Sequence, residues 1–256
     1  MRVCTLTSGS SGNSTYVSDG RTSVLIDAGL PGKRIEEQLD GIGVSGRDID
    51  AIFVTHEHDD HITGVGVLAR RFDIPVYANR ATMEYLDSMG KLNRIMPEKL
   101  IVFENNVSFI CGTFVVKAFP IPHDAADPVG YRFTSGSVSV AISTDIGVIT
   151  EDIRQGTLGC SVVLLEANHE VEMLRNGPYP YPLKKRILSD HGHLSNEVSA
   201  SYACELAQNG TKTIILGHLS EENNRPELAF EAVTKGLKEK DLLDSCRVIL
   251  APRYSH

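Results

Sequence analysis

Apolar and polar residues alternate in short runs along this chain, and the runs predict both strands and helices. Near the N-terminus, short apolar segments are separated by glycine, serine and aspartate, which is typical of strands joined by turns. Further along, β-branched runs alternate with segments whose apolar residues recur at helical spacing. The pattern predicts strands at residues 3–7, 15–17, 23–26, 51–55, 75–78, 107–119, 129–133, 138–143, 161–166, 213–216 and 247–250, and helices at residues 31–39, 61–72, 195–208 and 226–236.

Strand runs that alternate with helices predict an α/β fold of stacked layers with the sheets inside. No low-complexity linker or short repeat interrupts the 256 residues, so we expect one compact domain spanning residues 1–256. Gly41, Gly43 and Gly46 match G-x-G-x-x-G, but they follow a predicted helix and lead toward a strand. A dinucleotide-binding loop has the opposite order, so we expect no nucleotide cofactor.

The charge balance limits the kinds of partner. The chain has 25 Lys and Arg against 33 Asp and Glu, a formal net charge of −8. A broad nucleic-acid-binding surface is usually basic, so any contact with a polyanion must be local or metal-assisted. The five cysteines are widely spaced and form no C-x-x-C pair, which favours a reducing, cytoplasmic compartment. No apolar run is long enough for a membrane helix and no signal peptide is evident.

The strongest chemical signal is Thr-His-Glu-His-Asp-Asp-His at residues 55–61. It lies where a predicted strand ends and a helix begins, the usual place for a site in an α/β protein. His56 and His58 are two residues apart, so both can point the same way from an extended segment. Two histidines can hold one divalent ion, and Asp60 with His61 can hold a second. A polar, solvated loop is the alternative explanation of this segment.

This H-x-H-x-D-H pattern resembles the metallo-β-lactamase-fold hydrolase superfamily. Further residues match the family's other motifs in the right order along the chain: Asp27, His123, Asp145 and His218. The resemblance implies a four-layer αββα sandwich. Glutamate at the position of His58 is typical of iron redox members, so the histidine here favours hydrolysis.

The resemblance also implies the ligands of two divalent metal ions per chain. His56, His58 and His123 would hold one ion, and Asp60, His61 and His218 the other. Asp145 would bridge the two ions together with a hydroxide, Asp60 would count among the catalytic residues, and Asp27 would orient a ligand from behind. Nitrogen-rich ligands suit zinc, while the carboxylates admit manganese or iron.

Three further segments resemble one branch of the superfamily, the bacterial YycJ/WalJ group of 5′-to-3′ DNA exonucleases. They are Thr-Ser-Gly-Ser-Ser-Gly-Asn-Ser at residues 7–14, Leu-Leu-Glu-Ala-Asn-His at residues 164–169 and His-Gly-His-Leu-Ser-Asn at residues 191–196. His193 precedes a helix that Ser195 can cap, which suits a phosphate contact or a proton donor. Other candidates for substrate contact or for support of the site are Ser10, Asn13, Asn168, His169 and His191.

The segment just before residue 191 leaves two interpretations open. Bases could stack on Tyr179 and Tyr181 while the cations at residues 184–186 follow phosphates. An ordinary loop followed by a solvated helix face is the alternative. Asp145 and His218 are 218 − 145 = 73 positions apart, which leaves no room for a large inserted domain between them.

The function predicted from these residues is a dinuclear metal-dependent phosphodiesterase. The branch resemblance makes it a 5′-to-3′ exodeoxyribonuclease acting on DNA ends through a metal-bridging hydroxide. One rival is a hydrolase of a thioester, lactone or cyclic phosphodiester on the same metal site. A second rival is a non-catalytic nucleic-acid or metal-binding subunit, against which the intact ligand set counts. The oligomeric state does not follow from the sequence.

Overall fold

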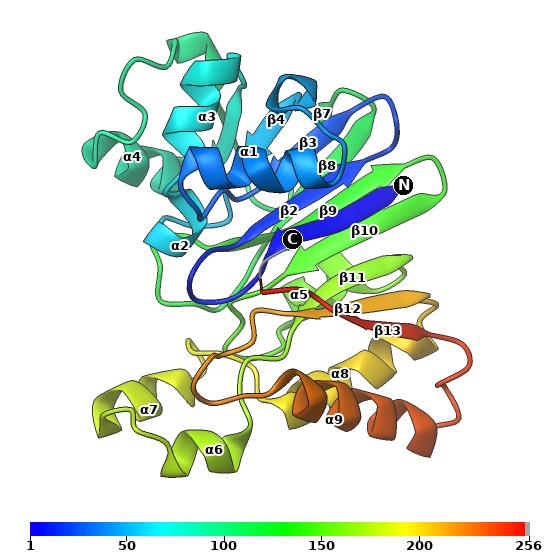
Figure 1. The fold of residues 1–256 in the computed structure, drawn as a ribbon. Helices are drawn as coiled ribbons and strands as arrows, with labels where there is room; N and C mark the ends of the chain where they lie inside the picture. Colours follow the sequence, from blue (N-terminus) through cyan, green and yellow to red (C-terminus); the bar gives the residue numbers. More distant parts are fainter. Residues whose placement is uncertain (254–256) are drawn as a thin grey trace. The chain divides into compact units, whose positions relative to one another are not determined.

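A computed structural model describes residues 1–253, and the chain divides into two compact units (Figure 1). The first unit comprises residues 1–118, residues 125–129 and the C-terminal arm from Pro252. The second unit comprises residues 119–124 and 130–251. Strands and helices alternate in both units, which confirms the predicted α/β class.

The sheet of the first unit follows chain order, β1-β2-β3-β4-β5-β6. Its first three strands pair antiparallel, and β3 to β6 run parallel. Because parallel strands are buried on both faces, β3 and β4 consist almost entirely of apolar residues. The six strands are β1 (Arg2–Thr7), β2 (Ser14–Ser18), β3 (Ser23–Ile26), β4 (Ala51–Phe53), β5 (Val76–Asn79) and β6 (Leu100–Phe103).

Helices of the first unit bury one apolar face each in its core, as Ile35 and Leu39 of α1 do. The predicted helix at residues 61–72 is two helices that meet at Thr63 and Gly64, where the Gly64 amide donates to the Ala28 carbonyl oxygen at 2.7 Å instead of to a carbonyl of its own helix. A Cβ on Gly64 would lie 2.4 Å from the carbonyl oxygen of Leu30, so the backbones touch there. The helices are α1 (Gly32–Gly41), α2 (Asp59–Ile62), α3 (Val65–Phe72) and α4 (Arg80–Ser88), with 3₁₀ turns η1 (Gly46–Asp48) and η2 (Pro97–Lys99).

The apolar run predicted as a single strand at residues 107–119 is a hairpin. β7 (Ser108–Cys111) and β8 (Phe114–Pro120) pair antiparallel around a tight turn. Gly112 occupies the turn with φ 55°, a left-handed conformation that glycine adopts readily. The alternation of apolar residues continues through this turn, which is why the pattern did not indicate it.

The sheet of the second unit contains β9 (Val129–Ser135), β10 (Val138–Ser143), β11 (Val162–Glu166), β12 (Thr213–Gly217) and β13 (Arg247–Leu250). β9 and β10 form the predicted antiparallel hairpin, whose turn contains Gly136 with φ 58°. From β10 to β13 the strands run parallel in the order β10-β11-β12-β13. The carboxyl ends of these four strands therefore lie side by side at one edge.

The helices of the second unit are α5 (Glu151–Thr157), α6 (Val171–Asn176), α7 (Tyr181–Ile187), α8 (Asn196–Gln208) and α9 (Pro226–Glu239). Ser195 caps α8 as predicted, since its Oγ accepts a hydrogen bond from the Val198 amide at 3.3 Å. α5 and α6 were not predicted, because each is too short for a repeated apolar spacing, whereas α7 corresponds to the helix in the second interpretation of this segment. None of the helices within residues 1–253 combines the length and apolar character needed to span a membrane.

Candidate metal-binding clusters

The residues selected from the sequence gather at the carboxyl ends of parallel strands in each unit. In the first unit, Asp27 follows β3, and residues 55–61 follow β4. In the second unit, Asp145 follows β10, Glu166 ends β11, and His218 follows β12. In α/β proteins, ligands bind beyond the carboxyl ends of the strands, so side chains at these positions can form a functional site.

Three of these strand-end residues have strained backbones. Asp27, Asp145 and His218 adopt left-handed φ values of 61°, 60° and 54°. A residue with a Cβ is uncommon in this region, and such strain is often found at functional sites. The strain turns the chain sharply at each strand end, so the side chain stays at the sheet edge.

In the first unit, His56, His58, Asp60 and His61 form what we name the first cluster. His56 Nε2 lies 3.1 Å from His58 Nδ1, and Asp60 Oδ2 lies 3.6 Å from His61 Nε2. Two ligand atoms bound tetrahedrally to one zinc ion at about 2.1 Å are separated by about 3.4 Å. The nitrogen and oxygen atoms of this cluster therefore have the chemistry and the spacing of metal ligands.

Asp27 supports the first cluster from behind. Its Oδ2 lies 2.8 Å from His61 Nδ1 and accepts a hydrogen bond from Thr55 Oγ1 at 2.8 Å, while the Thr55 amide donates to Oδ1 at 2.8 Å. Burial raises the pKa of Asp27, and His61 and Thr55 oppose that shift. This arrangement fixes the His61 ring and leaves its Nε2 facing Asp60.

Asn13 closes the glycine- and serine-rich loop beside the first cluster. Its Oδ1 accepts a hydrogen bond from the Gly9 amide at 3.0 Å, and its Nδ2 donates to Asp60 Oδ2 at 3.2 Å. Nδ2 also lies 3.1 Å from His61 Nε2. The loop therefore orders the cluster from this side, whereas Ser10 at its tip is exposed.

In the second unit, Asp145, Glu166, His193 and His218 form the second cluster. One ligand atom from each lies within 4.8 Å of the others. Asp145 Oδ1 is 3.2 Å from His218 Nε2 and 3.9 Å from His123 Nε2, so the carboxylate lies between these two imidazoles. Burial lowers the pKa of His123, and Asp145 opposes that shift.

Glu166 is a functional candidate that the sequence analysis missed. Its side chain is completely buried, Oε1 lies 2.7 Å from His193 Nδ1, and Oε2 accepts a hydrogen bond from the Ile146 amide at 2.6 Å. Burial disfavours the charged imidazole, but the Glu166 carboxylate outweighs it and raises the pKa of His193 to about 9. In the sequence, Glu166 lies within the Leu-Leu-Glu-Ala-Asn-His segment, where it looks like an ordinary strand residue. The sequence feature that could have indicated its role is a single acidic residue at the end of an otherwise apolar strand.

The three remaining predicted residues, Asn168, His169 and His191, have different surroundings in the structure. Asn168 Nδ2 donates to the carbonyl oxygen of His218 at 2.9 Å, so Asn168 holds the strained backbone there. The His169 ring is buried with neither nitrogen hydrogen-bonded within the described chain, and burial lowers its pKa to about 4. His191 is exposed, and its side chain is outside the second cluster.

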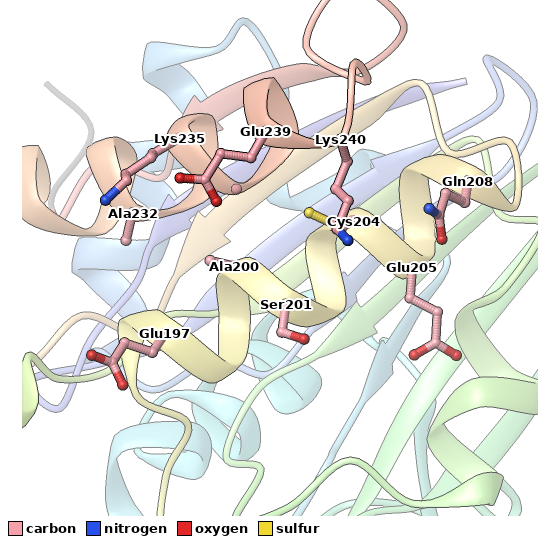
Figure 2. A pocket seen from close by; sticks show the side chains of 11 residues that line it. Glu197, Ala200, Ser201, Cys204, Glu205, Gln208, Ala232, Lys235, Glu239 and Lys240 are labelled. Carbon is pink, nitrogen blue, oxygen red and sulfur yellow. The ribbon is translucent and has the colours of Figure 1, made fainter.

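A groove of about 740 Å³ lies between α8 and α9, away from these residues (Figure 2). Small side chains such as Ala200, Cys204 and Ala232 line it, together with Glu197, Lys235 and other charged residues. None of the residues selected from the sequence lines it. The groove follows from the close approach of two helices through small residues.

Comparison with known proteins agrees with the motifs. The beta-lactamase superfamily domain matches residues 22–219. The chain is 42% identical to exodeoxyribonuclease WalJ of Streptococcus pneumoniae over 93% of this chain and 88% of the relative. It is 40% identical to exodeoxyribonuclease YycJ of Bacillus anthracis over 92% of this chain and 88% of the relative.

Solved structures share the fold at lower identity. The metallo-β-lactamase fold protein YhfI from Bacillus subtilis matches with a TM-score of 0.73 and 17% identity, over 99% of this chain and 97% of that protein. A diphosphatase of the PhnP family matches with a TM-score of 0.66 and 21% identity, over 99% and 94%. These likenesses confirm the predicted metallo-β-lactamase fold.

Proposed function

Because this chain belongs to the metallo-β-lactamase superfamily and to its WalJ/YycJ branch, we propose that it is a metal-dependent exodeoxyribonuclease that digests DNA from the 5′ end. The observation that carries the proposal is identity of 40–42% to named exodeoxyribonucleases over more than nine-tenths of this chain. The two clusters of metal-type donors support it, because phosphodiester hydrolysis in this setting depends on divalent ions. The polarity is carried over from the family resemblance.

The proposed ligands of two divalent ions are the seven residues that match the family motifs: His56, His58, Asp60, His61, His123, Asp145 and His218. Their donor chemistry fits zinc or manganese, with iron also admitted, since imidazole and carboxylate suit all three. Two ions bound by these residues would activate the attacking water and stabilise charge on the phosphate. Asp60 and Asp145 contribute only two negative charges against four positive ones, so the loaded site favours an anionic substrate.

His193 is the proposed proton donor. With a pKa of about 9, its imidazole carries a proton at neutral pH. Nδ1 is engaged by Glu166 at 2.7 Å, which leaves Nε2 as the atom that can donate to the leaving oxygen or to a non-bridging phosphate oxygen. Both Glu166 oxygens are already hydrogen-bonded, so Glu166 acts as a positioning residue for His193 and not as a metal ligand.

Purified protein loaded with manganese or zinc tests the proposal directly. It should digest DNA labelled at either end, release label first from the 5′ end, and lose this activity with a chelator. Release from the 3′ end first would contradict only the polarity. If DNA stays intact while a thioester, lactone or cyclic phosphodiester is turned over rapidly, the nuclease proposal is wrong. The small-molecule hydrolase is then the function.

We propose that the protein functions in the cytoplasm. All five cysteines are free thiols, and four of them are buried. Free, buried thiols are typical of proteins in reducing compartments. The substrate is a DNA end, and no membrane partner is part of the proposal.

A further inference from the structure

The segment from residue 173 to residue 189, which we name the cationic arm, has an unusual charge for this protein. It contains Arg175, Lys184, Lys185 and Arg186, and no Asp or Glu occurs between Glu172 and Asp190. The chain as a whole has a formal net charge of −8. The arm is therefore a local positive region, consisting of the end of α6, a proline-rich connection and α7 (Figure 1).

Two of the four cations keep a charge that no acidic group of the described chain neutralises. Arg175 pairs with Glu172 at 2.9 Å, and Arg186 Nε pairs with Asp124 Oδ2 at 2.5 Å. Lys184 Nζ instead donates to the backbone carbonyl oxygen of Arg175, which carries no net charge, and Lys185 is exposed. These lysines are available to an anionic ligand.

The connection between α6 and α7 is rich in proline, and the first residue of α7 presents an exposed aromatic ring. Residues 178–182 are Pro-Tyr-Pro-Tyr-Pro, of which Tyr181 and Pro182 begin α7, and Pro180 has φ −58° and ψ 148°, the polyproline II conformation. Prolines restrict the unbound chain, so ordering this segment on binding costs little entropy. Tyr181 is 77% exposed. A large apolar ring held this far into solvent on a rigid backbone is suited to stacking.

The arm is attached to the proposed proton donor. The His193 amide donates to the carbonyl oxygen of Ile187 at 3.0 Å, at the end of α7. A Cβ on Gly192 would lie 2.1 Å from that same oxygen, so the two backbones are in direct contact. Asp124, the partner of Arg186, has its other oxygen 3.4 Å from His123 Nε2. The arm is thus joined directly to the segments that carry His193 and His123.

We propose that the cationic arm binds the single-stranded part of the DNA substrate, with Tyr181 stacking on a base and Lys184 and Lys185 contacting phosphates. The inference rests on the proposed nuclease function and adds where the strand lies. Stacking on an aromatic ring beside cations is the usual way to bind single strands without sequence preference. Because the arm is fastened to His193, the bound strand would set which phosphate reaches the reacting groups.

Binding and turnover of the double variant Tyr181→Ala/Lys185→Ala test the arm. The probe is a fluorescent single-stranded oligodeoxynucleotide of about 12 nucleotides with phosphorothioate linkages, titrated against manganese-loaded protein. We expect Kd to rise about fivefold or more, since one stacked base alone contributes that much. The slope of log Kd against log salt should fall by about 0.7 for the lost phosphate contact. KM for unmodified DNA should rise by a similar factor as Kd.

A matched control removes the same residue types elsewhere: Tyr85→Ala/Lys33→Ala, whose side chains are 44% and 84% exposed in the first unit. It should bind the probe like the wild type. Equal binding by the arm variant and the wild type, or tighter arm-dependent binding of an RNA of the same sequence, would overturn the assignment. If the arm variant also lost turnover of bis(p-nitrophenyl) phosphate, the substitutions would have disturbed the reacting groups. That result would also overturn the assignment of the arm. Arm-dependent binding without DNA digestion would overturn the nuclease function alone.

Discussion

At the scale of single residues, the proposed metal site consists largely of buried side chains, several of which have a left-handed backbone. Asp145 combines a left-handed φ of 60° with a buried carboxylate 3.2 Å from His218 Nε2. Asparagine tolerates left-handed backbone at least as well as aspartate, because both short polar side chains can hydrogen-bond locally. The conformation and the charge of this position can therefore be tested separately.

Asp145→Asn should keep the fold and lose the metals. Because the amide has nearly the shape of the carboxylate, the melting temperature of the metal-free protein should change by only a few degrees. The proposed bridging charge disappears, so metal analysis should find fewer than two ions per chain after gel filtration. Full metal content in this variant would remove Asp145 from the ligand set.

Glu166→Gln should make activity fail at neutral pH. In the wild type, the His193–Glu166 ion pair stabilises the fold fully below pH 6.5 and is lost as pH rises through about 9, the raised pKa of His193. Without the carboxylate, the largest favourable interaction of the charged imidazole is lost, so burial moves the His193 pKa down and less of the imidazole carries a proton at pH 7. DNA turnover should fall about 10²–10⁴-fold, and the alkaline limb of the kcat profile should move to lower pH.

His193→Ala is the comparison for that variant. It should show a similar loss of kcat with two metals retained and no alkaline limb from this group. Loss of one ion in His193→Ala would make His193 a ligand, since its ring lies in the same cluster as Asp145 and His218. Wild-type turnover in His193→Ala would instead make it a structural residue.

At the scale of elements, short connections place the reactive groups as firmly as the strands do. α7 ends where the Ile187 carbonyl oxygen accepts the His193 amide, and Gly192 makes that approach possible. α8 begins three residues after His193, at Asn196, with Ser195 as its cap. His193 is thus fixed between the end of one helix and the start of the next.

Gly192→Ala should lower both stability and DNA turnover. Its Cβ would lie 2.1 Å and 2.4 Å from the Ile187 and Arg186 carbonyl oxygens, so the backbone must move and His193 with it. We expect a loss of about 1–3 kcal/mol in the free energy of unfolding, the usual cost of overpacking. Denaturant unfolding and kcat, measured on the same preparation, check both effects.

Gly236→Ala is the matched control for that substitution. Its Cβ would meet only ordinary contacts at 3.5 Å or more, and the position lies inside α9. Alanine there should stabilise the protein by up to about 1 kcal/mol through helix propensity, with DNA turnover unchanged. A loss of turnover in Gly236→Ala as large as in Gly192→Ala would show that turnover does not report on the position of His193.

At the scale of the whole molecule, metal binding and folding should be linked. Ions that bind only the folded chain raise its stability by RT ln(1 + [L]/Kd), which is about 2.7 kcal/mol at one hundred times Kd. We expect a chelator to lower the melting temperature by several degrees and manganese or zinc to restore it. Manganese should support DNA digestion at least as well as zinc. An unchanged melting temperature, with no metal found in the purified protein, would argue against a resident metal centre.

The sequence by itself determined the residue types of the site and the class of fold. Alternating apolar runs predicted most strands and the longer helices, because burial of one face imposes a period that can be read in one dimension. The metallo-β-lactamase fold followed from H-x-H-x-D-H and the later landmarks, and the comparisons confirm it. The seven metal ligands and the substrate contacts stay predictions.

Tertiary structure alone decided the features that depend on contacts between distant segments. Glu166 looked like one more strand residue until the fold placed His193 and the Ile146 amide against its carboxylate. The break between α2 and α3 depends on the Ala28 carbonyl oxygen, 36 positions before Gly64, which accepts the Gly64 amide at 2.7 Å. The cationic arm contacts His193 through the hydrogen bond from the His193 amide to the Ile187 carbonyl oxygen, an approach that Gly192 makes possible. Such contacts depend on which distant segments the folded backbone brings together, and this cannot be inferred from the local periodicity of the sequence.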